Sequence, residues 1–252
     1  MLKIRVMPTL LYKDVGLVKG SQFDSTRRVG SVLQSIKVYN LREVDELVFL
    51  DIAATLAGRR PDFQLIDDIA DECFMPLTVG GGVRTLADVR ELLAVGADKV
   101  ALNSAAVENP ALVREAAEAF GAQCVVVSID ARRRASGGYE VFTHCGTRAT
   151  GRTPADWARE VEGLGAGEIL ITSIDRDGTM EGYDIELTRE VSRAVTVPVI
   201  ASGGAGSYEH MEAVLRQTEA AALAAASMFH FTERTPREAK LHLQAAGFAV
   251  RL

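Results

Sequence analysis

Short apolar runs and amphipathic patterns alternate eight times along the chain. The apolar runs have the length and composition of β-strands, at residues 4–10, 46–52, 76–80, 98–102, 123–129, 168–173, 198–202 and 220–226. Helical spacing of apolar residues recurs between them, near residues 31–42, 62–73, 85–95, 109–119, 154–164, 184–195, 207–217 and 235–246. Strands this apolar are typical of a parallel sheet covered by helices. Eight such units predict a (β/α)8 barrel, with an open doubly wound sheet as the alternative.

The two halves of the chain repeat one another. A strand that runs into glycines at 76–84 is matched by the segment 198–207, and 46–51 is matched by 168–175. A third pair is formed by 99–104 and 222–227, so all three pairs are offset by roughly 120 residues. This two-fold repeat favours the closed barrel over the open sheet.

Composition restricts the other possibilities. A chain of 252 residues without a linker or low-complexity segment is expected to form one domain over residues 1–252. The net charge of −6, with no basic run beyond residues 132–134, argues against a nucleic-acid partner. No apolar run is long enough to cross a membrane, and the first five residues lead directly into the first strand, so no signal peptide is expected. Three scattered cysteines fit reduced thiols in a cytoplasmic protein, with neither a metal nor another cofactor expected.

Two segments exceed the repeat and follow predicted strands. Residues 11–30 form a long first loop, which we expect to act as a lid, and residues 138–148 are predicted to form a small hairpin. Active sites of (β/α)8 barrels are built from the loops at the carboxyl ends of the strands. Both insertions are therefore expected at the functional end of the barrel.

Glycine-rich turns at this end predict two anion sites. One combines Gly81 and Gly82 with Asn103 and Ser104, and the residues that repeat them are Gly203, Gly204, Ala226 and Ser227. Residues 177–179 would add backbone donors to the second site. Backbone N–H groups in such turns bind anions, so the pair predicts a long ligand with a phosphate at each end. The alternative is that the glycines serve only tight turns.

Asp130 closes the fifth strand and is the candidate general acid–base residue. The alternative is a capping or ion-pair role with the nearby Arg132, Arg133 or Arg134 as partner. Similarly placed polar residues are Asp51, Asp175, Thr78, Thr172 and Ser202. At the equivalent point the first strand offers only Leu11, with Asp14 three residues later.

Four charged residues stand near the starts of strands, at the opposite end of the barrel. They are Arg5, Glu46, Lys99 and Glu168. Two cations and two anions there are expected to form a closed ring of salt bridges, which would either stabilise the barrel or gate a passage through it. Spacing alone favours the stabilising role.

Over nearly its whole length the chain resembles the HisF family, the cyclase subunit of imidazole glycerol phosphate synthase. The matching stretches are 18–20, 45–52, 77–82, 96–100, 123–127, 129–131, 165–170, 172–179, 182–184, 199–206 and 227–231. In that family a glutaminase docks on the bottom of the barrel, and ammonia crosses the interior to a phosphorylated substrate at the top. The resemblance thus implies a HisH-like glutaminase partner in a heterodimer.

The resemblance also implies residue roles. The four charged residues Arg5, Glu46, Lys99 and Glu168 become the ammonia gate, and Asp98 and Gln123 become partner-facing positions. Lys19 becomes a catalytic residue of the closing loop, alongside Asp130. The implied phosphate contacts are Gly82, Asn103, Ser104, Asp177, Gly178, Gly203, Ala226 and Ser227.

One departure decides between functions. The family's first strand ends in an Asp that pairs with the fifth-strand Asp as acid and base, and Leu11 occupies that position here. An apolar side chain transfers no proton, and loss of a general acid or base typically lowers the rate about 10²–10⁴-fold. The stretch 8–14, with Tyr39 and Asn40, instead resembles the WbuZ branch, which is associated with amidation of surface-polysaccharide sugars beside a separate amidotransferase.

Three hypotheses follow from this departure. The first is a subunit that accepts ammonia from a glutaminase and channels it toward a phosphorylated or sugar substrate. The second is a true cyclase of histidine biosynthesis in which Asp14 or another group replaces the lost carboxylate. The third is a catalytically silent docking scaffold, which retention of Lys19 and Asp130 argues against.

Overall fold

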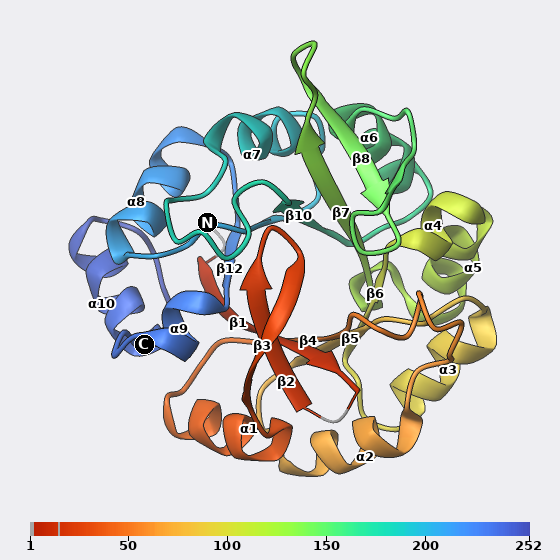
Figure 1. Cartoon of the computed structure of the whole chain (residues 1–252), viewed down its shortest axis with the longest axis horizontal. Helices are drawn as coiled ribbons and strands as arrows, with labels where there is room; N and C mark the ends of the chain where they lie inside the picture. Colours follow the sequence, from red (N-terminus) through yellow and green to blue (C-terminus); the bar gives the residue numbers. More distant parts are fainter. Residues whose placement is uncertain (1–2, 15) are drawn as a thin grey trace.

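The computed structural model describes residues 3–14 and 16–252, so Met1 and Leu2, with the expectation about the chain start, lie outside the described residues. Within these residues eight parallel strands pair in sequence order, and the last pairs with the first to close a barrel (Figure 1). They are β1 (Arg5–Lys13), β4 (Leu47–Asp51), β5 (Leu77–Gly80), β6 (Lys99–Leu102), β7 (Val125–Arg133), β10 (Glu168–Ser173), β11 (Val199–Ser202) and β12 (Ala222–Ala225). The predicted (β/α)8 barrel is confirmed.

A ring of helices surrounds the barrel and covers its outer face (Figure 1). It consists of α1 (Val32–Leu41), α2 (Phe63–Glu72), α3 (Leu86–Ala94), α5 (Ala111–Phe120), α6 (Pro154–Gly163), α7 (Ile185–Ser192), α8 (Tyr208–Gln217) and α10 (Pro236–Ala245). Side chains of Asp62, Thr85 and Thr153 accept backbone N–H groups and fix the starts of α2, α3 and α6. The short helices α4 (Ser104–Glu108), α9 (Ser227–Phe231) and η1 (Ala122–Cys124) are too brief for the helical periodicity to predict.

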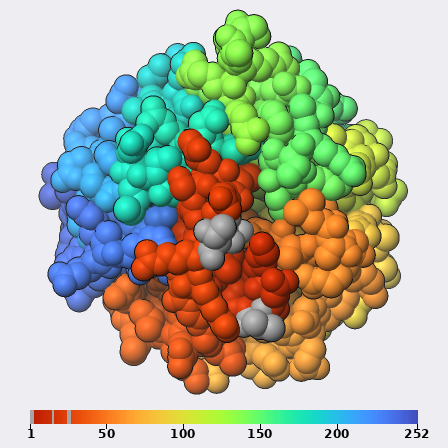
Figure 2. Space-filling view, viewed as in Figure 1, coloured from red at the N-terminus to blue at the C-terminus, as the bar shows by residue number. Residues whose placement is uncertain are grey.

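The long first loop, which we expect to act as a lid, forms a β-hairpin. Its strands β2 (Gly16–Ser21) and β3 (Asp24–Gly30) pair antiparallel, and β2 also pairs antiparallel with the end of β1 through Tyr12 and Lys13. The turn places both Gln22 and Phe23 at positive φ. The hairpin crosses the centre of the barrel mouth, as the ribbon and the space-filling view show (Figures 1 and 2).

The second insertion is a larger hairpin than predicted. Strand β7 does not end at residue 129 but continues to Arg133, where it pairs antiparallel with β8 (Tyr139–Thr143), and β8 pairs with β9 (Arg148–Ala149). The extension projects beyond the ring of helices (Figure 1). The sequence did not predict this extension, because a run of consecutive arginines such as 132–134 is typical of a loop.

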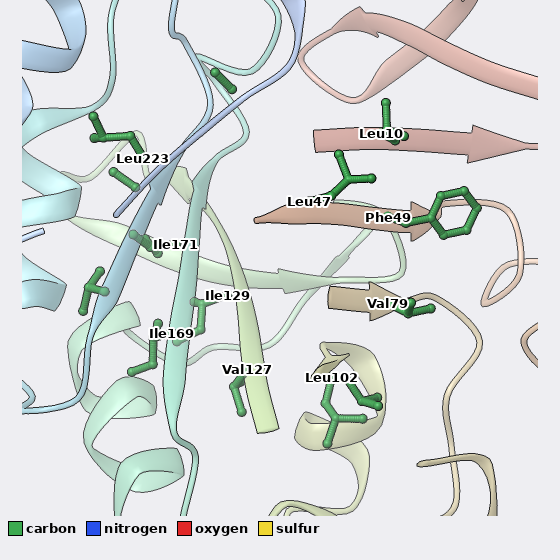
Figure 3. Close-up of a cluster of buried hydrophobic side chains, with 14 of the residues drawn as sticks. Leu10, Leu47, Phe49, Val79, Leu102, Val127, Ile129, Ile169, Ile171 and Leu223 are labelled. Carbon is green, nitrogen blue, oxygen red and sulfur yellow. The ribbon is translucent and has the colours of Figure 1, made fainter. Parts of the chain in front are cut away.

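Alternation along the strands produces two separate apolar regions. Outward side chains such as Leu47, Phe49 and Ile171, labelled in Figure 3, belong to the larger region, which also contains the buried residues of the helices. Inward side chains form a smaller group, which we call the inner belt: Met7, Val48, Ala101, Val126, Leu170, Ile200, Ala222 and Ala224. Period-two alternation in a closed barrel sends neighbouring residues to opposite faces. The interior is therefore lined by apolar side chains at this level.

A buried ion pair attaches α10 to the bottom of the barrel. The Lys240 ammonium donates to the Glu43 carbonyl at 2.8 Å and lies 3.3 Å from an Asp45 carboxylate oxygen. The other oxygen of Asp45 accepts the Val6 N–H at 2.9 Å. Both charged side chains are at least 96% buried, so each depends on the other for compensation.

We expect Lys240→Met to lower the free energy of unfolding by about 3–5 kcal/mol, because it leaves the Asp45 charge buried without its cation. Urea denaturation measures this loss. The exposed pair of Lys37 with Glu72 supplies the control, since Lys37→Met should cost less than about 1 kcal/mol. Equal effects of the two substitutions would contradict a buried ion pair.

Candidate functional site

One pocket opens at the carboxyl ends of the barrel strands and gathers the residues that the sequence singled out. Its lining includes Leu11 and every predicted catalytic or phosphate-contact residue: Lys19, Gly82, Asn103, Ser104, Asp130, Asp177, Gly178, Gly203, Ala226 and Ser227. These residues come from both halves of the repeat. Their placement agrees with the sequence analysis, while their roles remain predictions.

The glycines in the two predicted anion sites sit in backbone that excludes a side chain. Gly81 and Gly203 have φ of 103° and 87°, and a Cβ on either would approach a backbone carbonyl oxygen to 2.2 or 2.7 Å. Each turn therefore requires glycine for packing as well as for close approach of a ligand. The tight-turn interpretation and the anion-site interpretation are compatible here.

In the loop after β10, two of the backbone N–H groups that were expected to donate to an anion are already hydrogen-bonded within the loop. The Asp177 N–H donates to the Ser173 carbonyl, and the Thr179 N–H donates to the Arg176 carbonyl. The Asp177 carboxylate accepts two hydrogen bonds of 2.8 Å from the Lys19 ammonium. These bonds occupy the Asp177 and Thr179 N–H groups within the loop.

Lys19 is 2% exposed, and its bond to Asp177 locks the β2–β3 hairpin over the pocket. The Gln22 N–H adds a bond to the Asp177 carbonyl at 2.7 Å. Phe23 at the hairpin tip also lines the pocket. The hairpin is thus closed, with its cation directed inward.

Asp130 faces the pocket from the middle of β7. Its carboxylate accepts a hydrogen bond of 2.9 Å from the Asn103 amide, which also donates to the Ser128 carbonyl. Burial, with the nearby Asp177 charge as a smaller cause, raises the pKa of Asp130 to about 7 against the lowering effect of Asn103. A carboxyl group poised near neutrality is suited to give and take protons.

The capping and ion-pair alternative for Asp130 does not describe the structure. Arg132 lies 3.8 Å from Asp175, whereas Arg133 pairs with Glu186 and Arg134 with Glu140. All three arginines extend along the β7–β8 hairpin, where Arg132 and Arg133 stack on aromatic rings. Asp130 therefore faces the pocket with an amide, not a cation, as its hydrogen-bond partner.

The other carboxylates near the strand ends have structural partners. Asp51 accepts the N–H groups of Ala53 and Ala54 and lies 3.4 Å from Arg59. Asp175 accepts the Arg133 N–H and does not line the pocket. Of the polar neighbours, Thr172 and Ser202 line the pocket, but the buried Thr78 does not.

Asp14 is poorly placed to replace the absent acid of the first strand. It is exposed, has a left-handed φ of 59°, and is not part of the pocket lining. Its carbonyl accepts the Tyr12 hydroxyl at 2.5 Å, which holds it in the turn beyond β1. Asp14 therefore lies in an exposed turn outside the pocket lining.

Strand register makes the asymmetry of the site explicit. Leu102 pairs with Val127 across β6 and β7, and Ala225 pairs with Pro8 across β12 and β1. Asn103 follows Leu102 by one residue, and Asp130 follows Val127 by three. In the other half, the same steps from Ala225 and Pro8 lead to Ala226 and Leu11. The hydrogen-bonded amide–carboxylate pair in one half thus corresponds to two apolar residues in the other.

At the opposite end the four predicted charges close into a ring. Arg5 bonds to Glu46 at 2.7 Å and to Glu168 at 2.9 Å. Lys99 bonds to the same two carboxylates at 2.9 and 3.1 Å. Each side chain is at least 80% buried, so the predicted ring of salt bridges is confirmed as a structure. The inner belt separates this ring from the pocket, which reaches down to Leu170 and Ala224.

The expected partner-facing positions lie at this charged end. Asp98 and Gln123 are both exposed, one directly before β6 and the other in η1 before β7. Asp98 also accepts the Leu77 N–H at 2.8 Å, and Gln123 donates to the Phe120 carbonyl. Each therefore has a local structural bond in addition to an accessible surface.

Several pocket residues were missed by the sequence reasoning. Thr9, Phe23, Leu50 and Cys145 all line it. Thr9 could have been found from alternation, since it lies between the inward Met7 and Leu11. Cys145 could not, because it sits in a turn where His144, Cys145 and Gly146 all have positive φ.

Within the described part of the chain, no three His, Cys, Asp or Glu side chains are arranged to hold a metal ion. None of the helices described is long and apolar enough to span a membrane. Cys73, Cys124 and Cys145 are all free thiols.

The raised pKa of Asp130 predicts a pH-dependent stability. The folded protein binds this proton more tightly than the unfolded chain, where the pKa is near 3.8. Its contribution to stability therefore falls as pH rises from about 4 to about 7, and the full cost of the buried charge is present above that range. We expect Asp130→Asn to raise the free energy of unfolding by about 1–3 kcal/mol more at pH 8 than at pH 5.

Urea denaturation at the two pH values measures this difference. Substitution of the exposed Asp67 by Asn is the control and should give the same small effect at both. A gain for Asp130→Asn that does not change with pH would show that the carboxyl group titrates normally.

The sequence matches a known protein family. The family model described as histidine biosynthesis protein matches residues 5–235, which include all eight barrel strands, the charged ring and the pocket. A match over this share of the sequence establishes membership. The chain belongs to the histidine biosynthesis protein family of (β/α)8 barrels.

Proposed function

We propose that this protein is the HisF-like subunit of a glutamine amidotransferase system. It accepts ammonia from a HisH-like glutaminase at the charged end and passes it through the barrel to a phosphorylated or sugar substrate in the pocket. The observation that carries the proposal is the coaxial order of three layers: the charged ring, the inner belt and the pocket.

Electrostatics supports this order. An apolar belt has no polar groups to replace the hydration of an ion, so the free-energy cost of passing through it is high for ammonium and smaller for neutral ammonia. The belt also disfavours entry of bulk water. The ring of two cations and two anions is neutral as a set and can rearrange without leaving a net charge buried. Asp98 and Gln123 lie exposed at the same end, where the partner would dock.

The substrate in this proposal carries an anion at each end, held by the glycine turns of the two halves. Asp130 acts as the single acid–base group, because Leu11 occupies the equivalent position in the other half. The absence of the second carboxylate supports a role in sugar amidation. In this proposal the protein works in the cytoplasm, beside a separate amidotransferase. The alternative is a true cyclase, favoured by the retention of all predicted phosphate contacts in one pocket.

Binding to a HisH-like glutaminase tests the proposal directly. Glutamine hydrolysis by that glutaminase should rise when the barrel is added, and the two chains should form a heterodimer in sedimentation. If the barrel neither binds the glutaminase nor stimulates it, the proposal is wrong.

Cyclase activity separates the proposal from its alternative. With the bisphosphorylated aminoimidazole-carboxamide ribotide that HisF uses and excess ammonium salt, we expect no enzyme-like turnover by the native protein. Leu11→Asp should restore at least about 10²-fold, since it supplies the second acid–base group. The Asn side chain of Leu11→Asn has the same shape as Asp but no carboxyl group, so this variant should stay inactive. Rapid turnover by the native protein would favour the true cyclase.

The charged ring should matter only when ammonia comes from the partner. We expect Lys99→Met, introduced into the Leu11→Asp protein, to lower glutamine-dependent cyclase product formation severalfold, because it leaves Glu46 and Glu168 with Arg5 as their common cation. Product formation from added ammonium salt should stay unchanged, since that ammonia enters from solvent. The surface substitution Lys37→Met is the control. An equal loss in both assays would assign the ring a purely stabilising role.

A further inference from the structure

Two large apolar side chains are almost fully exposed at the charged end of the barrel. Leu41 is 85% exposed and Phe74 is 84% exposed, the highest values among the large apolar side chains of the described residues. Leu41 ends α1, and Phe74 lies between α2 and β5, so each stands in a connection that leads to the amino end of a barrel strand. Large exposed apolar side chains that gather in one place indicate a contact surface.

One amide side chain joins the two segments that carry these residues. The Asn40 amide donates to the Glu72 carbonyl at 2.6 Å, and its oxygen accepts the Phe74 N–H at 3.2 Å. Asn40 directly precedes Leu41, and α1 and α2 are neighbours in the ring of helices (Figure 1). Leu41 and Phe74 therefore belong to one junction, where α1 and α2 end side by side.

The backbone on both sides of Phe74 is held by further local bonds. The Cys73 thiol donates to the Met75 carbonyl at 3.3 Å, and the Leu47 N–H donates to the Pro76 carbonyl at 2.9 Å. Met75 is buried, whereas Phe74 beside it is exposed. A side chain on backbone that is already fixed loses little conformational freedom when a partner binds it.

The junction is continuous with the charged ring and with the expected partner-facing position Asp98. The Leu77 N–H, three residues after Phe74, donates to the Asp98 carboxylate at 2.8 Å. Leu47, which bonds to the segment after Phe74, directly follows Glu46 of the ring. A partner seated over the ring and Asp98 would therefore meet the junction at the edge of the same face.

Charge near the junction distinguishes between two possible occupants. The carboxylates at the surface there are Glu43, Asp71, Glu72 and Asp98, and the cations are Lys37 and Arg42. A second copy of this chain, docked through the same face, would bring these carboxylates against one another, and like charges across an interface oppose binding. A different protein with lysine or arginine around an apolar pocket would complement the face in both respects.

We infer that Leu41 and Phe74 form an apolar anchor for the glutaminase, which presents to them an apolar pocket edged with lysine or arginine. The inference rests on the proposed function and specifies the chemistry of the partner's surface. A few large side chains, aromatic ones above all, supply most of the affinity of a typical interface. Affinity for the partner and passage of ammonia then depend on different residues, the anchor for the first and the charged ring for the second.

Calorimetry tests the anchor with the HisH-like glutaminase of the heterodimer experiment as the probe. We expect Phe74→Ala to raise the dissociation constant at least about tenfold, and Leu41→Ala about threefold to tenfold, because each removes apolar surface that the partner buries. Phe74→Leu keeps a large apolar side chain and should recover most of the affinity.

A matched control separates the anchor from a general effect of apolar surface. Leu56 is 58% exposed and follows β4 at the opposite end of the barrel, so Leu56→Ala should leave the dissociation constant unchanged. Because Leu41 and Phe74 are exposed, neither alanine variant should move the midpoint of urea denaturation.

Two results would overturn the inference while the proposed function stands. The variant with both Leu41→Ala and Phe74→Ala could bind the glutaminase as tightly as the native barrel does. Alternatively, the native barrel alone could sediment as a dimer that Phe74→Ala converts to a monomer, which would assign the junction to a second copy. If the native barrel binds no HisH-like glutaminase, the proposed function itself is wrong and the inference falls with it.

Discussion

The parallel pairing of β12 with β1 is the constraint on which the site depends, because it closes the barrel and fixes which residues face one another. Its register pairs Ala225 with Pro8, as the register of β6 and β7 pairs Leu102 with Val127, so Ala226 and Leu11 take the positions that Asn103 and Asp130 take in the other half. A slip of one residue in a strand would exchange its inward and outward faces. The charged ring, the inner belt and the pocket are therefore three consequences of a single closed register.

These layers divide the tasks of the barrel along its axis. Charges meet at the amino ends of the strands, where they compensate one another in pairs. Apolar side chains fill the middle, and hydroxyl, amide and carboxyl groups meet at the carboxyl ends. The apolar belt lies between the two polar regions. The charge and polarity at one end of the barrel can therefore differ from those at the other end while the strands stay continuous. Family membership and this layering support the same proposed function from separate observations.

The barrel and most of the pocket lining could be predicted from sequence, because period-two strands and helical spacing are local patterns. The four-residue ring was also predictable, since each charge stands at the start of an apolar strand. The long-range partners were not predictable. Nothing near Asp130 in sequence indicates that Asn103 holds its carboxylate, or that its neighbouring arginines stack along a hairpin instead. The β2–β3 hairpin was missed because its short, mostly polar strands lack a clear alternating pattern.

The ion pair between Lys19 and Asp177 has a kinetic consequence for ligand exchange. Both oxygens of Asp177 bind the Lys19 ammonium, and the hairpin that carries it spans the mouth of the barrel. In the proposed function, this bond holds the hairpin over the pocket and opposes the entry and departure of a molecule as large as a bisphosphate. Entry and departure then share one energetic barrier, located on the hairpin and outside the reacting groups. In the proposed function, the residence time of a ligand then depends on β2 and β3, and it can change while the environment of Asp130 stays the same.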